Sequence, residues 1–126
     1  MIKAMLVSAN KDSFSDIKSV FAENNVETMW AESGSKALSI VFKTSLDIIV
    51  IDESVADMTG LDLAKKLISK NPMLNIAIIS TLSAEDFHES SAGLGILMQL
   101  SPAPSKSESE KLLANLNNIL SLTRTS

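Results

Sequence analysis

One aspartate in this chain directly follows a short apolar run, and this placement makes it the first candidate for chemistry. The run Ile48–Ile51 consists only of Ile and Val, which is typical of a central parallel strand that is buried on both faces. Asp52 would then lie at the carboxyl end of that strand, the edge of an open α/β sheet where ligands bind. Gly60, eight residues later, begins an amphipathic stretch. The alternative interpretation is that Asp52 only caps the loop at the end of the strand.

The remaining residue types offer no catalytic constellation. The sequence contains no cysteine, which excludes a disulfide framework and a thiolate metal site. Its single histidine, His88, has no cluster of further ligands around it, and we interpret it as a surface position. No Ser/His/Asp set and no paired carboxylates are visible, so we expect that the protein is not an enzyme. Residues 10–15 are too acidic and bulky for a phosphate-binding loop, which argues against a small ligand-binding domain.

The charge and hydropathy of the chain narrow the function classes further. There are 11 Lys and Arg residues against 15 Asp and Glu, which gives a net charge of −4. Because phosphate contacts need clustered basic residues, we expect no direct binding to nucleic acid. No apolar stretch reaches the length of a membrane span, and residues 1–7 are too short and too poorly flanked for a signal peptide. We therefore expect a cytoplasmic protein that does not bind membranes.

Five apolar runs alternate with helix-period stretches, and their order predicts the fold. The expected strands are residues 2–7, 26–31, 48–51, 76–79 and 96–100. The expected helices are residues 14–21, 34–42, 61–68, 83–91 and 105–122, and Asp12 or Ser13 can cap the first of them. This alternation predicts an α/β domain whose parallel strands are joined by right-handed crossovers. We place the domain at residues 1–122 and interpret residues 123–126 as a frayed tail or the start of a linker.

The spacing of three residues resembles that of a known family. Gly34 opens the second helix, Asp52 ends the third strand, and Gly60 follows eight residues later. On these residues the chain resembles the receiver domain of bacterial response regulators, the CheY-like superfamily, over nearly all of its length. The resemblance implies a flavodoxin-like fold, a three-layer doubly wound five-stranded parallel sheet with strand order 2-1-3-4-5. It also implies that Asp52 is the phosphoacceptor position of a two-component, or phosphorelay, signalling protein.

The metal site of such receivers is incomplete in this sequence. Receivers hold Mg²⁺ with the phosphoacceptor and two adjacent acids after the first strand, and the residues matched to these acids are Ala9 and Asn10. The remaining ligands would be Asn10, Asp52 and the carbonyl group of Ser54. Mg²⁺ prefers near-octahedral oxygen ligands that include one or two carboxylates. We therefore expect at most weak Mg²⁺ binding and no other cofactor.

Three further positions would contact the phosphoryl group or take part in switching. Ser80 matches the Thr or Ser that ends the fourth strand of receivers and hydrogen-bonds the phosphoryl group. Ser101 replaces the lysine of the family's Lys-Pro pair, and Met98 replaces the aromatic residue that turns inward on activation. The proline is retained as Pro102, and the resemblance implies a cis Ser101–Pro102 bond.

These substitutions predict a receiver domain with impaired Mg²⁺-dependent phosphorylation of Asp52. The alternative is a pseudo-receiver, which acts as a protein-protein interaction module without phosphorylation. The partners implied by the resemblance are a histidine kinase, a phosphotransfer protein or an output domain. They would bind the face formed by residues 83–91, 96–100 and 105–122, through which a homodimer can also form.

Overall fold

Strand β3 (Ile48–Ile51) lies at the centre of the sheet, as its sequence predicts. In the computed structural model, which describes residues 2–53 and 55–124, five parallel strands pair in the order β2-β1-β3-β4-β5. The other strands are β1 (Lys3–Val7), β2 (Glu27–Ala31), β4 (Ile76–Ile79) and β5 (Met98–Leu100). The predicted doubly wound sheet and its strand order 2-1-3-4-5 are therefore confirmed.

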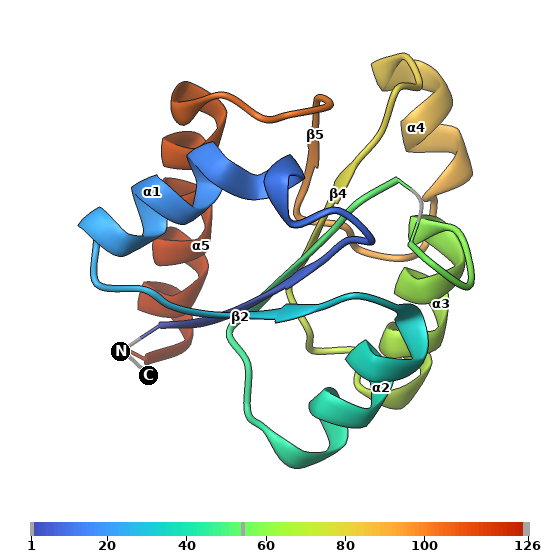
Figure 1. Cartoon of the computed structure of the whole chain (residues 1–126), viewed down its shortest axis with the longest axis horizontal. Helices are drawn as coiled ribbons and strands as arrows, with labels where there is room; N and C mark the ends of the chain where they lie inside the picture. Colours follow the sequence, from blue (N-terminus) through green and yellow to red (C-terminus); the bar gives the residue numbers. More distant parts are fainter. Residues whose placement is uncertain (1, 54, 125–126) are drawn as a thin grey trace.

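Helices cover both faces of the sheet (Figure 1). On one face lie α1 (Ser15–Glu23) and α5 (Lys106–Arg124), and on the other lie α2 (Gly34–Lys43), α3 (Gly60–Lys70) and α4 (Ala84–Ser90). Strand β3 contributes to both cores because successive side chains of a strand point to opposite faces. Ile48 and Val50 pack in the core beneath α1 and α5, whereas Ile49 and Ile51 pack in the core beneath α2 and α3.

Polar side chains fix the points at which α2, α3 and α4 begin. In each case a Ser or Thr hydroxyl accepts a hydrogen bond from a backbone N–H three residues later. The pairs are Ser33 with Lys36, Thr59 with Asp62, and Ser83 with Asp86. Each cap satisfies one of the N–H groups that have no partner within the helix. Because these helices follow strands in the chain, their caps also anchor the loops at the carboxyl edge of the sheet.

The start of α1 differs from the expectation, because neither Asp12 nor Ser13 caps it. A short 3-10 helix, η1 (Lys11–Phe14), comes first, and the side-chain oxygen of Asn10 accepts the N–H of Asp12 at 3.0 Å. Helix α1 then begins at Ser15 without a side-chain cap.

No helix in the described part of the chain is both long and apolar enough to cross a membrane.

Candidate functional site

Asp52 lies at the carboxyl end of β3, and the backbone around it is closely packed. The N–H of Asp52 donates to the Val7 carbonyl on β1 (2.9 Å), and the N–H of Gly60 donates to the Glu53 carbonyl (2.8 Å). A Cβ atom on Gly60 would lie 2.3 Å from the carbonyl oxygen of Asp52. The eight-residue spacing seen in the sequence therefore reflects the close approach of α3 to the residue that ends β3, an approach that only glycine allows without a backbone shift.

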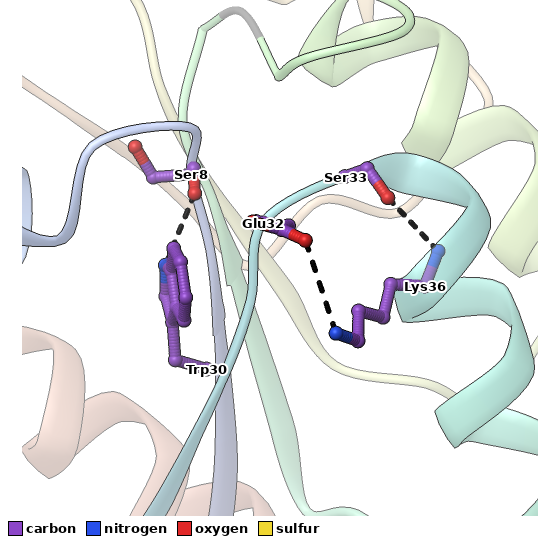
Figure 2. A network of polar contacts seen from close by, with 5 residues as sticks. All are labelled: Ser8, Trp30, Glu32, Ser33 and Lys36. Carbon is purple, nitrogen blue, oxygen red and sulfur yellow. Dashed lines mark hydrogen bonds and ion pairs between the residues drawn. The ribbon is translucent and has the colours of Figure 1, made fainter.

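Ser8, which directly follows β1, contacts the carboxylate of Asp52. Ser8 is fully buried, and its hydroxyl donates to Asp52 Oδ2 over 2.7 Å. The backbone of Ser8 is fixed as well, because its N–H donates to the Ala31 carbonyl and its carbonyl accepts the indole N–H of Trp30 at 3.0 Å (Figure 2). Asp52 Oδ1 accepts the N–H of Glu53 at 2.8 Å. Both carboxylate oxygens of Asp52 therefore have a donor within the chain.

The structure places the side chain of Ser8 on the Asp52 carboxylate, whereas the side chain of Asn10 bonds within its own loop. The residues that directly follow β1 are Ser8 and Ala9, whereas Asn10 uses its side-chain oxygen to cap η1. Sequence reasoning missed Ser8, although its position directly after the expected first strand was a signal that pointed to it.

The described residues form a poor site for Mg²⁺. Neither Ser8 nor Ala9 supplies a carboxylate beside Asp52, and Ser54 lies outside the described residues. Among the residues that the structure does describe, no group of three or more His, Cys, Asp and Glu side chains could hold a metal ion. One carboxylate and one hydroxyl do not match the near-octahedral set of oxygen ligands, with its carboxylates, that Mg²⁺ prefers.

Ser80 and Thr81 follow β4, the neighbour of β3, and have different partners. Ser80 is 6% exposed, and its hydroxyl accepts the N–H of Leu82 at 3.1 Å. Thr81 donates its N–H and its hydroxyl to the same oxygen, Glu53 Oε1, over 3.2 and 2.7 Å. A cavity of about 220 Å³ lies next to these groups and is lined by Glu53, Thr59, Leu61, Ile78, Ser80 and Leu82. The loops after β3 and β4 are thus joined one residue away from Asp52.

On the β5 side of the site, Ser101 and Met98 contact α5. Ser101 donates its N–H to Glu108 Oε2 over 2.9 Å and its hydroxyl to Glu108 Oε1. Met98 is half-buried, and its sulfur lies 3.8 Å from Asn115 Nδ2. The hydrogen bonds of Ser101 are therefore made to α5 and not to the Asp52 carboxylate.

The expected cis Ser101–Pro102 bond is wrong, since no peptide bond in the described parts of the chain is cis. Glu108 on α5 accepts both hydrogen bonds that Ser101 donates, so α5 fixes the loop after β5. The loop turns at Ala103, whose φ is 51°. A trans bond is the ordinary state of an X-Pro peptide.

Asp57 is a further structural residue of the site that the sequence did not single out. Its carboxylate accepts the N–H of Gly34 at 2.7 Å, the N–H of Ser35 at 3.1 Å and the hydroxyl of Ser35 at 2.8 Å. The hydrogen bond from the Gly34 backbone, followed by that from the Ser35 hydroxyl, lowers the pKa of Asp57 below its ordinary value. Asp57 therefore ties the loop after β3 to the start of α2, where the helix dipole also favours negative charge.

The acidic groups around the site accept hydrogen bonds from neutral donors. Asp52, Glu53 and Glu108 are held in this way. Among the side chains that the structure describes, an ion pair joins Glu32 to Lys36 at the start of α2, at 3.8 Å (Figure 2). None of these described side chains forms an ion pair with the carboxylate of Asp52.

Solved structures of response regulators share the fold of this chain. Among solved structures, the chain is similar to the receiver domain of the Francisella response regulator 1452, with 27% identity, a TM-score of 0.82 and coverage of 98% of this chain and 100% of that chain. It is also similar to a two-component response regulator from Clostridium difficile, with 18% identity, a TM-score of 0.83 and coverage of 99% and 100%. The chemotaxis response regulator CheY4 of Vibrio cholerae matches with 19% identity, a TM-score of 0.81 and coverage of 92% and 98%.

A search of curated proteins found no match. The profile of the response regulator receiver domain matches residues 4–114. Since that match spans most of the chain and the sheet has the predicted strand order, the chain belongs to the response regulator receiver domain family.

Proposed function

We propose that this receiver domain carries Asp52 at the phosphoacceptor position and that its Mg²⁺-dependent phosphorylation is impaired. The observation that supports the proposal is the Ser8 hydroxyl on Asp52 Oδ2, at 2.7 Å. A hydroxyl stands there in place of a carboxylate that could help to hold a divalent cation. The methyl group of Ala9 at the next position offers no ligand either.

The loss of charge has a large expected effect on the chemistry. At an effective dielectric constant of about 20, two unit charges about 4 Å apart interact by roughly 4 kcal/mol. Phosphoryl transfer depends almost wholly on positioning and on charges of this kind. Without the divalent cation and without the lysine that Ser101 replaces, a phosphoryl group near Asp52 would lose several kcal/mol of stabilisation, since each of these charges contributes roughly that amount.

The alternative is a pseudo-receiver that binds proteins without any phosphoryl chemistry. The contact between Ser101 and Glu108 favours it, because both donors of Ser101 are used within the chain. On this alternative the domain would act through its surface and would not be an enzyme, and Mg²⁺ would not be needed.

The proposed partners are a histidine kinase, a phosphotransfer protein or an output domain, as for receivers in general. We propose the face of α4, β5 and α5 as their binding surface and as the surface of a homodimer. A hollow of about 360 Å³ lies between α4 and β5 on this face, and Phe87, His88 and Ile96 are among its lining residues. The cytoplasm is the compartment in which such kinases would meet the domain.

Labelling by a small phosphodonor tests the proposal. The whole chain is incubated with acetyl phosphate and Mg²⁺, and its mass is followed over time. We expect little or no addition of a phosphoryl group to the wild-type chain. The variant with Ser8→Asp, Ala9→Asp and Ser101→Lys together should be labelled faster, because these residues would act as one clamp for metal and phosphate.

The control is the same reaction on the Asp52→Asn variant. Rapid and stoichiometric labelling of the wild-type chain that is lost in this control would refute impaired phosphorylation. A triple variant that folds but gains no labelling over the wild type would show that the missing charges are not the cause.

A further inference from the structure

Glu53 connects two loops at the candidate site, and neither its residue type nor its spacing suggested this role. Its Oε1 atom accepts the hydroxyl of Thr81 at 2.7 Å and the N–H of Thr81 at 3.2 Å. Glu53 directly follows Asp52, and Thr81 directly follows Ser80. Because β3 and β4 are neighbours in the sheet, the contact joins the loops that follow these two strands, one residue beyond Asp52.

The loop that contains Thr81 is held from its other side as well. The side-chain amide of Gln99 on β5 donates to the Leu82 carbonyl at 2.9 Å, and the N–H of Leu82 donates to the Ser80 hydroxyl at 3.1 Å. Residues 80–83, which we call the β4–α4 loop, are therefore fixed by a carboxylate from the β3 side and by an amide from the β5 side. Ser83 at the end of this loop caps α4, so the fixed loop leads directly into the start of α4.

The chemistry of the Thr81 donors shows what else could bind them. An N–H and an O–H that converge on one charged oxygen form the type of site that receives an oxyanion, and hydrogen bonds of this kind are among the stronger ones. In this chain the anion is the carboxylate of Glu53. The N–H of Glu53 itself is used by Asp52 Oδ1. An oxyanion that approaches Asp52 from the β4 side therefore finds the Thr81 donors already occupied.

We infer that Glu53 is a built-in substitute for an incoming oxyanion, which fills the Thr81 donors and fixes the β4–α4 loop without phosphorylation. The inference deepens the proposed function and rests on it for the identity of that oxyanion, a phosphoryl group on Asp52. It accounts for the hydrogen bonds that fix the β4–α4 loop without the divalent cation and the lysine of the proposed function. The cavity of about 220 Å³, which has Glu53, Ser80 and Leu82 in its wall, leaves space beside the contact for the loop to move when the carboxylate is removed.

Amide hydrogen exchange measured by NMR on the whole chain tests the inference. In Glu53→Ala we expect the Thr81 amide to exchange at least about tenfold faster, since a hydrogen bond to a charged group is lost. Glu53→Gln keeps an oxygen acceptor but removes the charge, so its exchange rate should lie between those of the wild type and Glu53→Ala. Leu82 and the first turn of α4 should follow the same order, whereas amides of β3 and β1 should be unchanged.

Glu110→Ala is the matched control, because it removes an exposed acid from α5 and should leave Thr81 unaffected. Equal Thr81 exchange in wild type and in both Glu53 variants would overturn the inference, as would an equal rise at every amide, which reports only a less stable fold. Rapid phosphorylation of the wild-type chain would instead refute the proposed function, and it would leave the exchange result in place.

Discussion

Replacement of Gly60 by alanine gives the most direct test of how the site is built. The added Cβ would lie 2.3 Å from the carbonyl oxygen of Asp52 and 3.2 Å from Ile51 Cγ2. A relaxed contact between carbon and a carbonyl oxygen is about 3.3–3.6 Å, so α3 or the end of β3 must move by about 1 Å. The obstructing atom belongs to the backbone, which cannot turn away as a flexible side chain can.

The expected magnitude follows from two opposing contributions. Overpacking of this kind costs about 1–3 kcal/mol, and the gain in helix propensity from Gly to Ala is at most about 1 kcal/mol. We therefore expect the free energy of unfolding to fall by about 1–2 kcal/mol, which corresponds to a decrease of roughly 3–8 °C in Tm for a domain of this size. Urea unfolding and differential scanning calorimetry measure both quantities.

Gly34→Ala is the matched control, since Gly34 is also the first residue of its helix. Its added Cβ would meet Met58, with Cε at 2.5 Å and Sδ at 2.6 Å, and a methionine side chain can adapt to such a contact. Gly34→Ala should therefore cost clearly less stability than Gly60→Ala. If Gly60→Ala were as stable as the wild type, or cost no more than Gly34→Ala, the close approach of α3 to Asp52 would not be the reason for a glycine at this position.

Two further predictions concern protons and metal. The folded-state pKa of Asp57 is lowered, so its contribution to stability is complete above its ordinary value of 3.8 and is lost as the pH falls through the folded-state value. The Tm of the wild type should therefore fall more steeply than that of Asp57→Asn as the pH is lowered from neutral to acidic values. The same pH dependence of Tm in both proteins would contradict the role of the three hydrogen bonds of Asp57. Titration calorimetry with millimolar Mg²⁺ should show no saturating site, and micromolar binding that is lost in Asp52→Asn would contradict the poor ligand set.

The fold could be predicted because its signals are local and repeated. The run Ile48–Ile51 is apolar at every position, and a strand that contributes to two cores needs this composition. Gly60 also carried a correct signal, since its spacing from Asp52 reflects a backbone contact. Both features can be recognised from residue types and their spacing.

The hydrogen bonds of the site were harder to predict because they depend on where side chains point. Asn10 was expected beside Asp52, but a short polar side chain can equally bond the backbone two residues on, and here it caps η1. Nothing in the sequence singled out Glu53 or Asp57, and only the three-dimensional arrangement shows that they bind Thr81 and the start of α2. The Ser101–Pro102 bond was inferred from the resemblance, and the contact of Ser101 with Glu108 could not be read from either residue.

The hydrogen bond between Trp30 and Ser8 makes the intrinsic fluorescence of the protein a probe of the loop beside Asp52. Trp30 is the only tryptophan in the chain, and there is no tyrosine, so near-ultraviolet emission comes almost entirely from one indole. That indole donates to the carbonyl of Ser8, whose hydroxyl contacts Asp52. A displacement of Ser8 changes the surroundings of the indole. The intensity and wavelength of Trp30 emission therefore report on the loop after β1 without an attached dye.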